Sequence, residues 1–203
     1  MVTNFSQQKL VAAIKMVLFP AALLPFARLV AAGAGGHLGA NPIEKITRDT
    51  GWWTLTLLLL TLTMTPLRRL SGWSGWVRLR RMLGLFAFFY ACLHFSTYLV
   101  LDQFFDWPAI LKDIAKRPYI TVGFSAFLLL IPLAVTSTEG MIRRLGGRAW
   151  RQLHRLVYVA AFAGVVHFTW LVKKDLTRPL IFAASLAALL GMRLVLWLRS
   201  QGR

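Results

Sequence analysis

Three of the four histidines, His94, His154 and His167, lie inside apolar stretches that are long enough to cross a membrane. A histidine surrounded by hydrocarbon needs a partner, so it usually has a function. Neutral imidazole is the commonest protein ligand of metal ions and a standard axial ligand of haem iron. The three residues therefore indicate a metal or haem site between helices. For His154, which lies beside Arg151 and Arg155, the alternative is a structural hydrogen bond between helices.

The composition predicts an integral membrane protein. Of the 203 residues, 57% are hydrophobic and 15% are charged, whereas soluble domains contain about 25% charged residues. A spanning helix needs roughly 20 apolar residues, and six segments approach this length: 10 to 33, 51 to 67, 82 to 101, 118 to 136, 153 to 172 and 179 to 198. The loops between them are short. We therefore expect a single domain, residues 1–203, that is an all-α bundle of six membrane helices.

The cysteine content restricts the type of haem. Cys92 is the only cysteine, and the sequence contains no Cys-x-x-Cys-His motif for covalent attachment. Any haem in this chain is therefore expected to be b-type, held by ligation and packing alone.

The formal charge of +17 follows the predicted topology. If the N-terminus is cytoplasmic, the only acidic residue on that side is Glu139, and the opposite side mixes basic and acidic residues. By the positive-inside rule, both termini are then cytoplasmic. Nucleic-acid binding is not expected, because the basic residues are accounted for by the membrane. The basic residues on the cytoplasmic side are Lys9, Lys15, Arg68, Arg69, Arg78, Arg80, Arg81, Arg143, Arg144, Arg148, Arg151, Arg155, Arg193, Arg199 and Arg203.

Counting residues along the predicted helices places His94 and His167 at the same depth. His94 precedes Leu101 by seven residues, which is about 10 Å from the periplasmic end of its helix. His167 precedes Val172 by five residues, or about 8 Å. The third and fifth predicted helices run in the same direction, so the two imidazoles can face each other across the bundle. Such a pair can supply both axial ligands of one haem.

His154 lies thirteen residues before His167, about 20 Å away towards the cytoplasm. At that level the third helix offers Arg80, Arg81 and Met82 but no histidine. On a straight helix the thirteen residues also turn the two side chains about 140° apart. A second haem at His154 would require a kink, a shared ligand or a weaker second site.

A membrane transporter is the alternative from another functional class. Proton and cation transporters usually carry carboxylates within the membrane. All seven acidic residues of this chain fall in loops or at the ends of predicted helices. This distribution favours electron transfer over ion transport.

A family resemblance joins these features. The run Leu145-Gly-Gly-Arg-Ala-Trp-Arg-Gln-Leu-His154-Arg-Leu-Val-Tyr158, followed by His167-Phe-Thr-Trp170 and Lys173, resembles the haem-binding core of ferric-reductase-type transmembrane proteins. More closely, the chain resembles the MsrQ (YedZ) family. Supporting motifs follow in order between residues 24 and 173: Leu24-Pro25-Phe26, Leu38-Gly-Ala-Asn-Pro42, Thr65-Pro66-Leu67, Arg80-Arg81-Met-Leu-Gly84, Leu93-His94, Arg117-Pro118-Tyr119 and Thr136-Ser-Thr138.

The resemblance implies a multi-pass protein of the bacterial inner membrane that binds haem b, as one group or two, and FMN. It implies electron transfer from the quinone pool or a cytosolic flavin reductase to MsrP. MsrP is a periplasmic molybdopterin enzyme that reduces methionine sulfoxide in oxidised proteins, so the bond chemistry belongs to the partner. The matching histidines are His94, His154 and His167. Larger relatives carry two histidines on the third-type helix and a fused dehydrogenase domain, and this sequence shows neither. A membrane ferric reductase or another cytochrome b subunit is the closest alternative.

Overall fold

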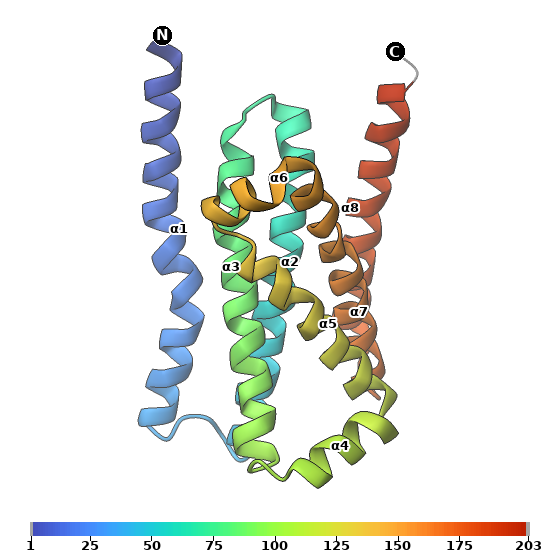
Figure 1. The fold of residues 1–203 in the computed structure, drawn as a ribbon. Coiled ribbons are helices and arrows are strands. Elements are labelled where there is room, and N and C mark those ends of the chain that lie inside the picture. The colour runs from blue at the N-terminus through green and yellow to red at the C-terminus, as the bar shows by residue number, and fades with distance from the viewer. Residues whose placement is uncertain (1, 202–203) are drawn as a thin grey trace. The chain divides into compact units, whose positions relative to one another are not determined.

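The computed structural model describes residues 2–201, and within that range it is helical and contains no β-strand (Figure 1). This result confirms the all-α fold class. The helices form two compact units, Met1–Tyr98 and Leu99–Arg203. We describe each unit by itself.

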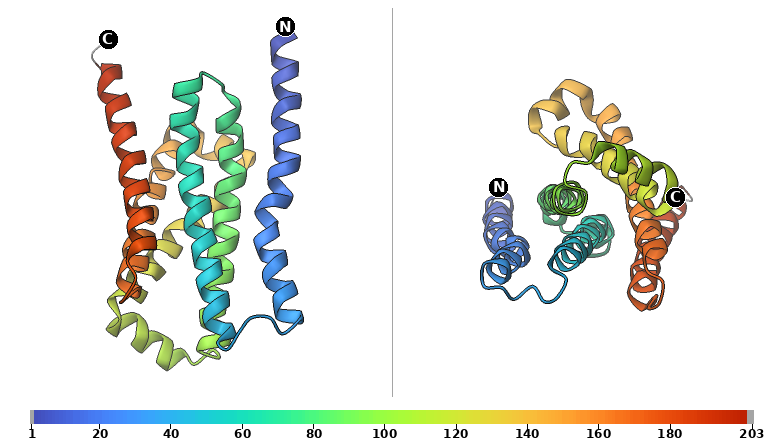
Figure 2. Two further views of the ribbon diagram at one scale, coloured as in Figure 1. Left: turned by 180° about the vertical axis from the view of Figure 1, so that it is seen from behind. Right: turned by 90° about the horizontal axis from the view of Figure 1, so that it is seen from below.

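The first unit contains α1 (Val2–Ala34), α2 (Pro42–Ser71) and α3 (Gly75–Ser96). Helices α2 and α3 lie side by side as an antiparallel hairpin in all views (Figures 1 and 2). The turn between them begins at Gly72, which has φ 72° and caps the end of α2 in the left-handed conformation that glycine tolerates. Leu62 and Ala87 are both 0% exposed, which places the core of this unit along the hairpin.

A buried tyrosine joins α1 to α3. The hydroxyl of Tyr90 donates to the carbonyl of Ala22 at 2.7 Å and accepts from the amide of Phe26 at 3.1 Å. In an uninterrupted helix the amide of Phe26 would donate directly to the carbonyl of Ala22, four residues earlier. The hydroxyl is therefore inserted into the hydrogen-bond ladder of α1, directly after Pro25, a position where helices commonly bend.

The second unit contains α4 (Trp107–Lys116), α5 (Pro118–Val135), α6 (Glu139–Leu153), α7 (Leu156–Leu171) and α8 (Thr177–Gln201). Helix α7 packs against α5 and α8, and α6 runs crosswise to α7 (Figure 1). Ala160 and Ala161 of α7 are almost fully buried, as expected where small residues let membrane helices approach closely. At the start of α8, hydrogen bonds from Thr177 to the carboxylate of Asp175 lower the pKa of this exposed group.

The π-helical segment η1 (Thr97–Asp102) follows α3 directly. Together, α3 and η1 form one of the four candidate membrane spans found among the described residues, which are Gln7–Ala34, Gly75–Asp102, Pro118–Val135 and Thr177–Arg199. Helix α7 is apolar but has 16 residues, and α2 is rich in threonine. Five of the six predicted segments follow a single helix, or α3 with η1. The segment 153 to 172 was wrong as one helix, because the chain breaks at His154 and Arg155 between α6 and α7. The amphipathic α4 and α6 are additional. The count of six spans and the cytoplasmic termini stay predictions.

Candidate functional site

His94 lies in the last turn of α3 and is half-buried. Its Nδ1 atom is 2.9 Å from the backbone carbonyl oxygen of Thr47 in α2. A carbonyl oxygen can only accept a hydrogen bond, so Nδ1 must carry the proton. The lone pair of the neutral ring is then on Nε2, which is the arrangement that metal-ligating histidines usually have.

His167 repeats this arrangement in the second unit. It lies in α7, and its Nδ1 atom is 2.7 Å from the carbonyl oxygen of Tyr119 in α5. By the same argument Nδ1 donates the hydrogen bond and Nε2 carries the lone pair. The two histidines that sequence counting placed at one depth are therefore held in the same tautomer by the same type of contact.

A glycine faces each ring, four residues after the carbonyl that holds it. A Cβ atom on Gly51 would lie 3.0 Å from Cε1 of His94, and a Cβ atom on Gly123 would lie 2.5 Å from Nδ1 of His167. Both separations are shorter than ordinary van der Waals contact. Glycine thus leaves the space in which each imidazole reaches a helix carbonyl. The sequence analysis did not identify either residue.

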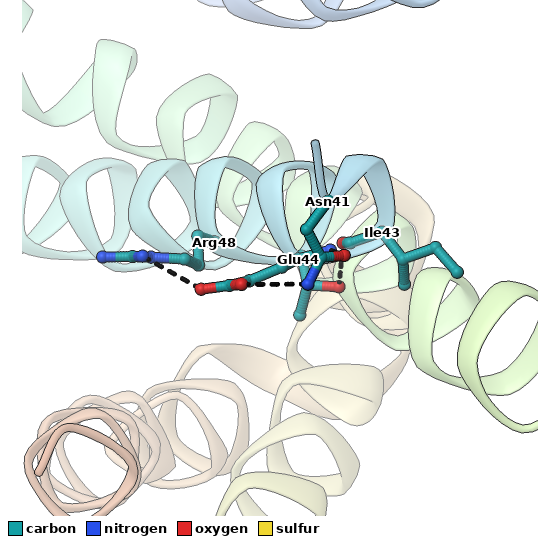
Figure 3. Close-up of polar contacts among 5 residues, drawn as sticks. Asn41, Ile43, Glu44 and Arg48 are labelled. Carbon is teal, nitrogen blue, oxygen red and sulfur yellow. Dashed lines mark hydrogen bonds and ion pairs between the residues drawn. The ribbon is translucent and has the colours of Figure 1, made fainter. Parts of the chain in front are cut away.

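The helices that present these carbonyls have well-defined starts. Asn41, the cap of α2, and Glu44 in its first turn exchange hydrogen bonds of 3.3 and 3.1 Å, and Arg48 pairs with Glu44 at 3.1 Å (Figure 3). Pro42 occupies the first turn of α2, where its missing N–H costs nothing. Pro118 begins α5 in the same way. The motifs Asn41-Pro42 and Arg117-Pro118-Tyr119 therefore begin α2 and α5. These are the two helices whose carbonyls accept the hydrogen bonds of His94 and His167.

A repeat in the sequence could have identified the glycines. Thr47 and His94 are 47 residues apart, and Tyr119 and His167 are 48 residues apart. The histidines begin similar runs, His94-Phe-Ser-Thr-Tyr-Leu-Val100 and His167-Phe-Thr-Trp-Leu-Val172. The first run has one more residue than the second. This extra residue falls where α3 widens into the π-helix η1, a form that accommodates an extra residue per turn.

His154 is held in a different way. It caps the end of α6, and α7 begins only at Leu156, so His154 and His167 do not share one straight helix. The hydroxyl of Thr136 donates to the carbonyl of Pro132 at 2.6 Å and lies 3.1 Å from Nε2 of His154. Since the hydroxyl has one proton, Nε2 must donate to it.

The ring of Trp150 adds to this corner at the end of α5. It stacks on the imidazole of His154 with 3.9 Å between centroids, and its indole N–H donates to the carbonyl of Thr136 at 2.9 Å. In His154, therefore, the ring nitrogen Nε2 carries a proton, whereas in His94 and His167 the protonated nitrogen is Nδ1. Its Nε2 is engaged within the α5–α6 corner.

The structure thus separates the three predicted residues. His94 belongs to the first unit, and His167 and His154 lie towards opposite ends of α7 in the second. Taken singly, each of these two histidines, with Nδ1–H on a helix carbonyl and the lone pair of the neutral ring on Nε2, has the donor chemistry of an axial haem ligand. The joint ligation of one haem by His94 and His167 stays a prediction.

Comparison with known proteins supports the resemblance. The family model described as "Ferric reductase like transmembrane component" matches residues 50–165, a range that includes His94 and His154 and stops just before His167. The similar proteins include several that carry the name "Protein-methionine-sulfoxide reductase heme-binding subunit MsrQ". That of Herminiimonas arsenicoxydans is 61% identical over 91% of this chain and 85% of its own length. That of Rhodospirillum rubrum is 59% identical (89% and 87%), and that of Ralstonia nicotianae is 52% identical (95% and 90%).

Proposed function

Because this chain belongs to the MsrQ family of haem-binding subunits of protein-methionine-sulfoxide reductase, with a ferric-reductase-like transmembrane domain, we propose that it delivers electrons to a periplasmic reductase. The proposed partner is an MsrP-type molybdopterin enzyme that reduces methionine sulfoxide in oxidised proteins. The proposed donor is the quinone pool or a cytosolic flavin reductase. The chain then acts in the bacterial inner membrane and performs no bond chemistry on the final substrate.

The observation that carries this proposal is the matched pair of imidazoles. His94 and His167 each direct Nδ1–H to a helix carbonyl, so each keeps the Nε2 lone pair that iron requires. Their equal depth along the predicted spans supports ligation of the same haem b. When bound, haem b supplies a one-electron carrier that alternates between the ferric and ferrous states.

The residues around the histidines have two tasks in this proposal. The carbonyls of Thr47 and Tyr119 fix the orientation of the rings and increase the basicity of Nε2, as partners of metal-ligating histidines generally do. The apolar side chains of the surrounding helices exclude water. Ligation and burial together set the reduction potential of a haem.

The proposal extends to His154 as a cofactor-binding residue on the cytoplasmic side. There it would serve a second haem or the entry of electrons from the donor. Coordination of iron through Nε2 requires that the contact with Thr136 be broken first. FMN binding is proposed from the family resemblance alone.

The test of the haem proposal is the absorption spectrum of the purified protein. We expect His94→Ala and His167→Ala to abolish the Soret band, because each removes one axial ligand of a haem held only by ligation and packing. His37→Ala is the matched control, since His37 is exposed in the loop between α1 and α2. Unchanged spectra in both site variants would refute the ligand assignment. A wild-type protein that binds no haem would instead favour a transporter or a structural subunit.

A second measurement separates the proposed acceptor from that of a ferric reductase. The dithionite-reduced protein is mixed with purified MsrP in one experiment and with a ferric chelate in another, and reoxidation is followed at the haem absorption bands. We expect fast reoxidation by MsrP and slow reoxidation by the chelate. The reverse order would favour the ferric reductase alternative.

A further inference from the structure

We propose that Gly51 and Gly123 are positioning residues that set the strength of the Nδ1–H hydrogen bonds of His94 and His167, and thereby the reduction potential of the haem. The inference rests on the proposed function, because it concerns the same two histidines. It assigns a role to residues that contact neither iron nor substrate.

The argument begins with the space around each ring. Helix carbonyls normally lie beneath side chains and accept one bond from the amide four residues later. The carbonyls of Thr47 and Tyr119 each accept an additional bond from an imidazole, and the residue four positions later is a glycine in both cases. A carbonyl oxygen has two lone pairs, so it can accept both bonds. The hydroxyl of Thr50 also lies 3.1 Å from the carbonyl of Thr47, but it has a closer acceptor in the carbonyl of Ile46 at 2.7 Å. The missing side chain is what opens the second direction of approach.

The two glycines are not under equal steric constraint. A Cβ atom at Gly123 would lie 2.5 Å from Nδ1, 2.8 Å from Cε1 and 3.0 Å from Cγ of His167, so the ring would have to move. A Cβ atom at Gly51 would lie 3.0 Å from Cε1 and 3.1 Å from Nδ1 of His94. The neighbouring ring there must yield by only a few tenths of an ångström. The structure thus predicts a graded effect, larger at Gly123.

The chemical consequence follows from the bond that the glycines permit. An imidazole that donates Nδ1–H to a carbonyl gains electron density at Nε2 and becomes a stronger ligand. A stronger donor stabilises ferric iron over ferrous iron and so lowers the reduction potential. When a methyl group displaces the ring, the hydrogen bond lengthens and the potential moves to more positive values.

The experiment compares Gly123→Ala and Gly51→Ala with two controls in the full-length protein. A Cβ atom at Gly84 in α3 would have ordinary contacts with Thr61, the nearest at 3.6 Å, and one at Gly191 in α8 would have no neighbour within 4 Å. We expect Gly123→Ala to raise the midpoint potential and to change the low-spin electron paramagnetic resonance g values. Gly51→Ala should show a smaller shift in the same direction. Gly84→Ala and Gly191→Ala should match the wild type.

Each outcome decides the inference. If Gly123→Ala loses haem while its circular dichroism and elution volume remain those of the wild type, the steric argument is supported. The shift in reduction potential is then measured on Gly51→Ala. If both alanine variants keep the wild-type g values and potential, the inference is wrong. The proposed function would survive that result provided that His94→Ala and His167→Ala lose the Soret band. A wild-type protein without haem would overturn the proposed function itself.

Discussion

At the scale of single residues, the position of one proton distinguishes the three membrane histidines. Nδ1 is protonated in His94 and His167, because each donates to a backbone carbonyl, and Nε2 is protonated in His154, because it donates to the hydroxyl of Thr136. The first arrangement leaves Nε2 with the lone pair that metal-ligating histidines usually use. The second arrangement turns that atom towards a protein partner.

Substitution of His154 tests whether this residue binds a cofactor. If His154 serves a second haem, His154→Ala should lower the haem-to-protein ratio without abolishing the Soret band, because His94 and His167 remain. The ratio is measured by the pyridine haemochrome assay against quantitative amino-acid analysis. Full haem content with normal reduction by the donor would show that His154 is a structural residue that joins Thr136 and Trp150 at the α5–α6 corner.

These protonation states lie beyond what the sequence could predict. Counting residues along the chain placed His154 and His167 far apart, and in the structure they lie towards opposite ends of α7. The equal depth of His94 and His167 stays a prediction. The tautomers depend on carbonyls 47 and 48 residues away, which only the packing of α2 on α3 and of α5 on α7 brings to the rings. Gly51 and Gly123 have no side chain to suggest a role, so only the repeated run that begins at each histidine pointed to them in the sequence.

At the scale of helices, hydrophobicity predicted the long elements and missed the amphipathic ones. The predicted segment 118 to 136 agrees closely with Pro118–Val135. The predicted segment 10 to 33 lies within Val2–Ala34 and agrees with it at the C-terminal end. Helices α4 and α6 were not predicted, because their apolar residues are interrupted by charged ones and form no continuous run. The sequence did not predict the break between α6 and α7 at His154. The residues before His154 are largely basic and those after it are apolar, and this change in composition does not indicate where a helix ends.

The attachment of α1 to α3 provides a test at this scale. Tyr90→Phe removes the hydroxyl that bridges the carbonyl of Ala22 and the amide of Phe26. We expect a loss of about 1 kcal/mol in the free energy of unfolding, which is typical of one buried hydrogen bond between helices.

Hydrogen–deuterium exchange localises this effect. Amides in the middle of α1 should exchange faster in Tyr90→Phe than in the wild type, and amides of α7 should exchange at the same rate in both. Equal exchange in α1 would mean that the ladder of α1 closes around the missing hydroxyl and that the bridge contributes little to its attachment.

At the scale of the whole molecule, the charges on α4 and α6 predict the orientation of the chain in the membrane. Helix α4 precedes α5 and helix α6 follows it, so a membrane-spanning α5 separates them by one bilayer. Helix α6 carries four arginines and one glutamate, and α4 carries lysines together with an aspartate. The positive-inside rule therefore predicts that α6 lies at the cytoplasmic face and α4 at the periplasmic face.

Cysteine labelling tests this orientation. In a Cys92→Ser background, which removes the only native thiol, Lys112→Cys on α4 and Gly140→Cys on α6 each introduce one exposed thiol. We expect a membrane-impermeant maleimide to label the thiol at position 112 in intact spheroplasts. The thiol at position 140 should react only after permeabilisation, because α5 and the bilayer separate it from the reagent. The opposite pattern would reverse the orientation, and labelling of both positions in intact spheroplasts would mean that α5 does not span the membrane.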